Sequence, residues 1–469
     1  MTGTQKKAAV YVCAALGGVL FGYDTAVVNG ALFQLEDYFS LGTNSTTGGL
    51  IVSIAVCGAF IGAMIGGLVA SRWGRRTSLI VADILFVVGS CTLAAAPSCT
   101  CRTWHWYFFM VVPVYLAEVT EAETRGNVIS INSICICGSQ FIAAVVCGIL
   151  VYFSSTSVGW RWMFGLGVVP AVIQLMAVAV FLPESPRWLQ SCGRDSEAQD
   201  IAIKYGIGLS TTTELSAQCL SEWDQYKIVF SAALRQRVFL GVGLQILQQF
   251  SGINTVMYYS ANILKNVGFG GGKAPVLLSI PLAFTNALFT LIATFYADKL
   301  GRKLLLRTSL IGCGTATAGM MVVGILQSTD SVATSTGGWI FVGLLGIYLM
   351  FFAPGLGAMP WVVMSEIYPT NVRSTASGVA TMANWASNAL VSQCFPLLVG
   401  SIGVGPTFGI VAGIEVVGLI VVTKFVPETK GLTLEEIDGY FNKAQSGEEH
   451  TGDSSHLLAS DRVNISRVQ

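Results

Sequence analysis

Long apolar stretches alternate with short polar segments along almost the whole chain. A helix needs about 20 apolar residues to cross the hydrocarbon core of a membrane. By this measure the pattern predicts twelve spans, six on each side of a longer polar segment. Each span is expected to be a helix, because backbone groups in lipid must form their hydrogen bonds within the segment. The spans are expected at 8–30, 49–70, 78–96, 103–118, 127–152, 161–182, 238–263, 275–297, 304–326, 338–364, 373–399 and 403–426.

The polar segments repeat one order of residues in the two halves of the chain. A basic cluster comes first, then a Glu and an Arg seven residues apart, and then a Pro-Glu pair. Paired halves in an apolar chain are typical of secondary transporters, whose substrate site lies between the repeats. The first copy comprises Arg72–Arg76, Glu118, Arg125 and Pro183-Glu184, and the second comprises Asp298–Lys303, Glu366, Arg373 and Pro427-Glu428.

The repeat predicts four regions. An N-terminal six-helix bundle is expected over 1–187, followed by a cytoplasmic linker of short helices over 188–237. A second six-helix bundle is expected over 238–430, and a polar cytoplasmic tail over 431–469.

One spacing differs between the two halves. Gly74 and Glu118 are 44 residues apart, whereas Gly301 and Glu366 are 65 apart. The basic residues on both sides of the first interval should lie on the same side of the membrane, so two spans must fit inside it. Two full spans would need about 40 residues alone. The fourth span, 103–118, is therefore expected to be abnormally short.

The composition excludes an ordinary water-soluble domain. Hydrophobic residues make up 53% of the 469, and charged residues make up only 11%, against about 25% in soluble domains. The net charge is zero, which gives no reason to expect a nucleic-acid partner. The Lys and Arg residues gather in alternate loops. We therefore expect a multi-pass protein of the plasma membrane with both termini cytoplasmic.

The seventh span carries the densest set of polar side chains. Gln245, Gln248 and Gln249 share one face of a helix. Asn254 lies off that face, but a helix break at Gly252 would bring it round. Amide groups both donate and accept hydrogen bonds, which suits a ligand made of hydroxyl groups. The alternative is that these amides only join helices to one another.

Polar residues in other spans fit the same kind of site, because such side chains are costly in lipid and usually face an interior cavity. Asp24, in the first span, is a candidate for a group that gains and loses a proton. The alternative for Asp24 is a structural hydrogen bond or salt bridge. The other candidates in this group are Gln140, Asn286, Trp361 and Asn384.

We interpret the basic clusters as gating chemistry rather than as substrate contacts. Arg and Lys at the cytoplasmic helix ends can pair with nearby acids in one conformation, and breaking the pairs would accompany opening to the other side. The residues assigned to gating in this way are Arg75, Arg76, Glu118, Arg125, Asp298, Arg302, Glu366 and Arg373.

Together the motifs resemble the sugar porter family of the major facilitator superfamily. Leu20–Thr25 is most similar to protozoan proton/myo-inositol symporters. The resemblance implies an all-α membrane protein, a major-facilitator bundle of twelve helices in two pseudo-symmetric halves. It also implies that sugar hydroxyls are held by Gln140, Gln248, Gln249, Asn254, Asn286, Trp361 and Asn384, that Asp24 couples protons, and that Tyr258 and Tyr259 form an aromatic gate.

Two departures from the family pattern bear on activity. Ser71 stands where the family has an Asp, which removes one gating partner. Residues 101–109 lack the spaced glycines of the family's fourth span, which also supplies an Arg partner for the acid at position 24. Arg102 is a candidate for a displaced remnant of that Arg.

The leading hypothesis is a secondary active transporter that moves a sugar or polyol, such as myo-inositol or a hexose, together with a proton. The alternatives are an uncoupled facilitative carrier and a transport-defective or sensor-like homologue, which the short fourth span favours. An enzyme is not expected, because no nucleophile–base pair or metal constellation occurs. No cofactor is expected. A metal site built on histidine is not expected either, since the chain has only three histidines.

Overall fold

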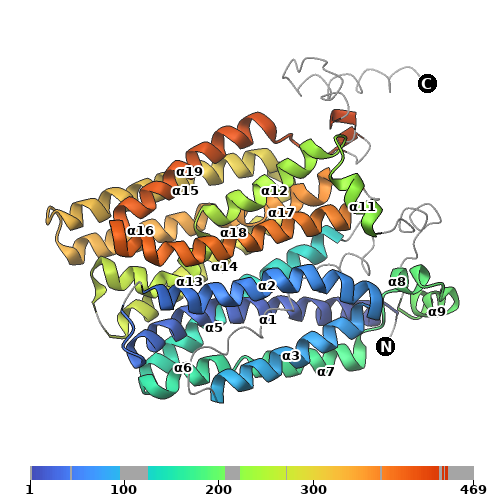
Figure 1. Ribbon diagram of the computed structural model, residues 1–469, viewed down its shortest axis with the longest axis horizontal. Helices are drawn as coiled ribbons and strands as arrows, with labels where there is room; N and C mark the ends of the chain where they lie inside the picture. The colour runs from blue at the N-terminus through green and yellow to red at the C-terminus, as the bar shows by residue number, and fades with distance from the viewer. Residues whose placement is uncertain are drawn as a thin grey trace. The chain divides into compact units, whose positions relative to one another are not determined.

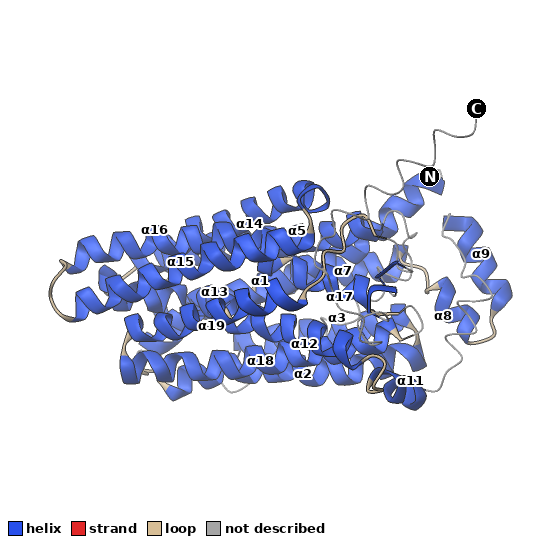
Figure 2. Ribbon diagram, turned by 90° about the horizontal axis from the view of Figure 1, so that it is seen from above, coloured by secondary structure: helices blue, strands red, loops and turns tan. Residues whose placement is uncertain are grey.

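The computed structural model describes residues 3–42, 45–95, 125–205, 222–270, 272–369, 372–432, 436–437 and 439–441. Residues 1–430 form one compact unit, and 431–469 form a second. The described residues contain helices and no strand (Figure 2). Eight of their helical segments are long and apolar enough to cross a membrane. The expectation of an all-helical chain built for a membrane is confirmed.

The first half is built from long helices that correspond to the predicted spans. Its fourth predicted span, 103–118, lies outside the described residues. The helices are α1 (Gly3–Tyr38), α2 (Thr46–Trp73), α3 (Arg75–Ala95), α5 (Arg125–Phe153), α6 (Thr156–Gly165) and α7 (Val168–Phe181).

The predicted end of the first span is wrong by two helical turns. We expected the span to end at Gly30, whereas α1 continues to Tyr38. The extra residues include Gln34 and Glu36, which are buried despite their polarity. Hydropathy alone ends a span at such residues, but here helix α1 stays inside the protein and its polar side chains face other helices.

The second half follows the same order of helices after the linker. The linker contains α8 (Pro186–Ser191), α9 (Asp195–Tyr205) and α11 (Glu222–Val229), as short helices were expected there. The second half comprises α12 (Arg235–Phe250), α13 (Ile253–Leu264), α14 (Ala274–Leu300), α15 (Arg302–Ser328), α16 (Thr334–Phe352), α17 (Met359–Ile367), α18 (Arg373–Ile402) and α19 (Val404–Phe425).

Figure 1 shows the helices of the 1–430 unit lying side by side along one direction. We call the end where α7 leads into α8 and α9 the linker end, and the opposite end, where α1 meets α2, the α1–α2 end. Among the described helices, the closest contacts between the two halves are those of α2 with α18, α5 with α14, and α1 with α13. The helices between the halves therefore come from both copies of the repeat.

The repeated polar motif forms the same local structure in both halves. Gly74 and Gly301 each have positive φ, +92° and +88°, which glycine adopts without strain. The helix that follows each glycine, α3 or α15, has its N-terminus capped by the carboxylate of the Pro-Glu pair from the same half. Glu184 accepts hydrogen bonds from the first two backbone N–H groups of α3, and Glu428 accepts from the first two of α15. These acids therefore cap helix N-termini, where a negative charge is stabilising.

Candidate functional site

Asn384 on α18 is the centre of a buried amide network. Its Nδ2 donates to Gln245 Oε1 at 2.7 Å and to Gln248 Oε1 at 2.9 Å. Its Oδ1 accepts from Gln249 Nε2 at 2.9 Å. Gln249 Oε1 in turn accepts from Asn254 Nδ2 at 2.7 Å. The structure thus brings together four of the predicted sugar ligands, Gln248, Gln249, Asn254 and Asn384.

The orientation of every amide in this network follows from two backbone carbonyls. Gln248 Nε2 donates to Leu356 O at 2.7 Å and to Gly357 O at 3.0 Å. A carbonyl can only accept, so the nitrogen end of Gln248 must lie there and its oxygen must face Asn384. The remaining amides then have only one arrangement in which each donor meets an acceptor.

The predicted helix break at Gly252 is present. Gly252 has φ +90° and separates α12 from α13. The break turns Asn254 back toward the amides of α12, where it donates to Gln249 as described above. Asn254 is partly exposed, whereas Gln248 and Gln249 are buried. The open edge of the network is therefore at Asn254.

Two further predicted ligands join the halves. Asn286 Nδ2 on α14 donates to Gln140 Oε1 on α5 at 3.1 Å. Both side chains are buried, each with 6% exposed. Trp361 on α17 is partly exposed. Trp385 on α18, next to Asn384 in the sequence, contacts Phe21 of the first half edge-to-face at 5.7 Å. Neither Asn286–Gln140 nor Trp361 is hydrogen-bonded to the amide network by a described bond.

The two predicted gate tyrosines are buried on α13 and contact α18. Tyr259 donates to Ser392 O at 2.8 Å, and Tyr258 accepts from Asn388 Nδ2 at 3.3 Å. Asn388 Oδ1 accepts from the Ser392 hydroxyl at 3.0 Å. The tyrosines therefore hold α13 against α18 within the second half.

Asp24 lies inside the first half, on α1, with only 6% exposed. The adjacent Tyr23 hydroxyl donates to Met163 O on α6 at 2.8 Å. Helix α1 packs closely on α5 beside Asp24. This is seen at Gly22, where an added side chain would overlap Ile136 and Ser139 of α5. The fourth span, from which a partner for Asp24 was expected, lies outside the described residues.

Several gating candidates form contacts at the ends of described helices. Arg302 pairs with Glu366 at 3.0 Å, and Glu366 also accepts from the Thr429 hydroxyl, all within the second half. Arg76 donates to Ala179 O at the end of α7. Arg373 donates through Nε to Tyr368 O. These contacts hold helix ends in place within one half.

For the other gating candidates, the structure describes the backbone position or nothing at all, except for Arg75. Arg75 begins α3 under Glu184, as described above. Arg125 begins α5 and Asp298 lies near the end of α14, but their side chains are outside the described part of the structure. Glu118 falls in the segment that is not described.

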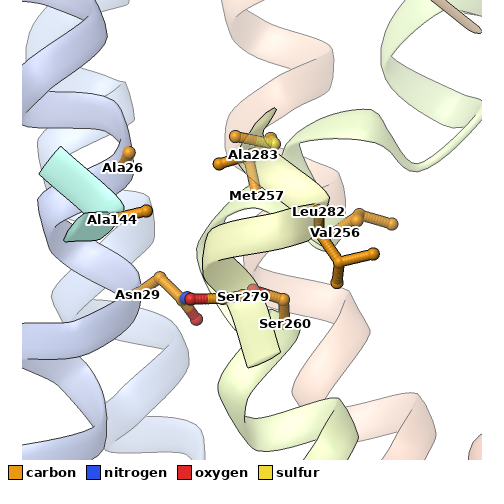
Figure 3. Close-up of a pocket in the computed structure, with 9 residues that line it drawn as sticks. All are labelled: Ala26, Asn29, Ala144, Val256, Met257, Ser260, Ser279, Leu282 and Ala283. Carbon is orange, nitrogen blue, oxygen red and sulfur yellow. The ribbon is translucent and has the colours of Figure 1, made fainter. Parts of the chain in front are cut away.

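A small cavity of about 10 Å³ lies between the halves (Figure 3). This volume is close to that needed for one water molecule and is too small for a sugar. Figure 3 shows α1 and α5 on one side of it and α13 on the other. The lining residues are Ala26, Asn29, Ala144, Val256, Met257, Ser260, Ser279, Leu282 and Ala283. It is separate from the amide network, which we regard as the binding site on chemical grounds.

Several polar residues at the meeting of the halves were missed by the sequence prediction. Asn29 Oδ1 accepts from the backbone N–H of Ala261 at 2.9 Å. Glu36 Oε1 accepts from Asn262 Nδ2 at 3.0 Å. The sequence does carry a signal for Glu36, which is a second acid twelve residues after Asp24 on the same helix. It was missed because the first span was expected to end at Gly30. Among the residues that the structure describes, no group of His, Cys, Asp and Glu could hold a metal ion.

Solved structures with the same arrangement define the class of protein. The partially occluded, inward-open xylose transporter XylE from E. coli matches 92% of this chain and all of its own length, with a TM-score of 0.76 and 29% identity. The major facilitator superfamily proton:xylose symporter XylE bound to 6-bromo-6-deoxy-D-glucose matches 94% of this chain and all of its own length, with a TM-score of 0.72 and 29% identity. The fold is that of a major-facilitator membrane transporter, which confirms the predicted fold class.

Sequence comparison narrows this class to a family. Residues 10–441 match the family model described as "Sugar (and other) transporter". Membrane transporter D1 of Leishmania donovani is 46% identical over 445 residues, covering 93% of this chain and 81% of that protein. The human proton myo-inositol cotransporter is 34% identical over 541 residues, covering 93% of this chain and 83% of that protein. This chain belongs to the sugar transporter family, and it is a transporter rather than an enzyme.

Proposed function

We propose that this protein moves a polyol such as myo-inositol, or a hexose, by alternating access and in symport with a proton. The amide network is the observation that carries this proposal. It offers donors and acceptors in a buried position, and a hydroxyl group can both donate and accept. A polyol can therefore replace amide–amide bonds at Asn254 without leaving a buried polar group unpaired.

The relatives support the choice of substrate and coupling ion. Similar proteins include the probable inositol transporter 2 of Arabidopsis thaliana, 34% identical over 523 residues, and the human proton myo-inositol cotransporter. In this chain the proposed ligands are Gln140, Gln248, Gln249, Asn254, Asn286, Trp361 and Asn384, and the proposed gate comprises Tyr258 and Tyr259.

We assign proton coupling to Asp24. A charged carboxylate inside a membrane protein is costly unless it is paired, so such groups often belong to proton relays. Burial of Asp24 next to the contact between α1 and α5 fits this role. The proposal also places the protein in the plasma membrane with both termini cytoplasmic. The α1–α2 end then faces outward, and the linker end faces the cytoplasm.

Uptake of labelled myo-inositol and glucose into transport-deficient cells tests the proposal, with and without a proton uncoupler. We expect accumulation of one of these substrates that the uncoupler abolishes. Asp24→Asn should remove the uncoupler-sensitive part, because an amide cannot carry the proton. Asp37→Asn changes an exposed acid of the same helix and should leave uptake unchanged.

Each other outcome excludes one part of the proposal. Uptake that is indifferent both to the uncoupler and to Asp24→Asn would mean an uncoupled facilitative carrier. No uptake by protein that reaches the cell surface would mean a transport-defective or sensor-like homologue.

A further inference from the structure

We propose that Glu36 is a second proton-binding carboxyl, and that a proton on it favours closure of the α1–α2 end. The inference rests on the proposed function only in taking this end as the outer one. Glu36 lies on α1, twelve residues beyond Asp24 and close to the end of the helix. It contacts the opposite half of the molecule, so its chemistry acts where the halves must separate.

The contact is a direct hydrogen bond between the halves. Glu36 Oε1 accepts from Asn262 Nδ2 of α13 at 3.0 Å. About two turns earlier on α1, Asn29 accepts from the backbone N–H of Ala261, the residue before Asn262 on α13. A third contact between the halves at this end joins the Ser53 hydroxyl on α2 to Gln393 Oε1 on α18 at 2.7 Å. The α1–α2 end is therefore closed by polar contacts.

The pair Glu36–Asn262 has two buried acceptor atoms and no donor between them unless Glu36 carries a proton. Glu36 and Asn262 are both 4% exposed. Glu36 Oε2 and Asn262 Oδ1 are buried without a hydrogen-bond partner among the described residues. With an ionised carboxylate both atoms are acceptors, and neither can satisfy the other. A proton on Oε2 supplies a donor and lets the carboxylic acid and the amide exchange two hydrogen bonds.

No described salt bridge neutralises Glu36. The positive charge of Lys265 acts on Glu36 and favours the ion, but its ammonium lies over the ring of Phe33 at 5.6 Å and no described salt bridge joins the two side chains. Lys273 donates to Tyr152 O at 2.8 Å. Arg161 on α6 donates to Ser157 O and lies over Trp160. Asp37, next to Glu36, is exposed. The charged residues of α2, α9 and α14 lie toward the linker end.

Because Glu36 is buried when the α1–α2 end is closed, binding of a proton to Glu36 is linked to closure of that end. In the closed arrangement the carboxyl is out of water, where the neutral acid costs much less than the ion. Separation of the halves at this end exposes Glu36 to the outer solution, where the ion is hydrated. Raising the external pH should therefore favour opening of the α1–α2 end, and lowering it should favour closure.

Thiol labelling from outside measures this opening without any substrate. Ser260, buried in the small cavity between α1 and α13, is replaced by Cys, and labelling by a membrane-impermeant maleimide is compared with that of the parent protein. The variant S260C is then compared with S260C combined with Glu36→Gln at each external pH. The ratio of their two rates removes the intrinsic pH dependence of the thiol.

Glu36→Gln keeps the size of the side chain and supplies an N–H donor for Asn262 Oδ1, so it should mimic the protonated acid. We expect the ratio of labelling rates, S260C over the double variant, to rise with pH by up to about tenfold per unit, the limit for one linked proton. A ratio that does not change with pH would overturn the inference.

Ser53→Ala is the matched control, because it removes a contact between the halves that contains no ionisable group. It should raise labelling equally at all pH values. A rising ratio in a protein that takes up neither sugar would leave the role of Glu36 standing and would count against the proposed function alone.

Discussion

At the scale of single residues, the amides of α12 are held in fixed orientations by their hydrogen bonds. Two carbonyls of the segment before α17 hold Gln248, and the order of donors then passes through Asn384 to Asn254. Buried polar groups are costly when one partner is missing, so such a network keeps a single arrangement. In the proposed site, the hydroxyl groups of a sugar or polyol would meet this fixed pattern of donors and acceptors.

Gln248→Ala should raise the KM for the transported sugar by tenfold or more. In the proposed site Gln248 holds a sugar hydroxyl and orients Asn384, and a hydroxyl buried without its partner costs about 1–3 kcal/mol of binding free energy. Initial uptake rates over a range of sugar concentrations measure this change.

Gln327→Ala is the control for Gln248→Ala. Gln327 also donates to two backbone carbonyls, Val267 O and Thr334 O, but it does so at the α1–α2 end of α15. It should lower thermal stability without changing KM. An unchanged KM for Gln248→Ala would place the sugar elsewhere.

At the scale of elements, the interruption between α12 and α13 distinguishes this helix pair from a continuous span. The two segments are 16 and 12 residues long, each shorter than the roughly 20 residues of a full span, and both carry polar side chains of the proposed site. Because of the break at Gly252, amides on both sides of it, Gln249 on α12 and Asn254 on α13, lie within hydrogen-bond distance of each other. Tyr258 and Tyr259 then anchor the second segment to α18.

Gly252→Ala should destabilise the protein by about 1–2 kcal/mol, because an L-residue is strained in the left-handed region. Space is not the cause, since the nearest atom to an added Cβ is Val411 Cγ1 at 3.7 Å. Thermal unfolding in detergent and uptake rate should both fall.

Gly243→Ala in α12 is the matched control for Gly252→Ala. Gly243 lies within the helix, and an added Cβ there meets nothing within 4 Å. The substitution should raise stability slightly, by about 0.5–1 kcal/mol, because alanine loses less backbone entropy in a helix. Equal effects of the two substitutions would contradict the strain argument.

At the scale of the whole 1–430 unit, the halves meet closely at the α1–α2 end. Besides the polar contacts of Asn29, Glu36 and Ser53, α5 approaches α14 at Gly148, where an added Cβ would lie 2.7 Å from Ile280. Alternating access requires these surfaces to part and close again in each cycle. Small residues and exchangeable hydrogen bonds permit both states.

Gly148→Val should keep the α1–α2 end from closing fully and reduce transport at least tenfold, because the new methyl groups overlap Ile280. Surface expression should remain, because the atoms that an added Cβ meets are the far ends of flexible side chains, Ile280 and Leu277. Gly138→Val is the control: it lies on the same helix, and an added Cβ meets nothing within 4 Å. Labelling of Ser260→Cys should increase with Gly148→Val alone, and equal transport by both variants would contradict this account.

The sequence alone determined that the protein is an all-helical membrane transporter, and it supplied the candidate residues for the proposed sugar site. Lipid forces apolar helices, and the few polar residues in them, such as Gln248 and Asn384, stand out for that reason. Only the tertiary structure decided that Glu184 and Glu428 cap helices, that Arg302 pairs with Glu366 inside one half, and that Glu36 faces Asn262. These contacts join residues far apart in the chain, so their partners depend on how the helices pack and not on any local pattern.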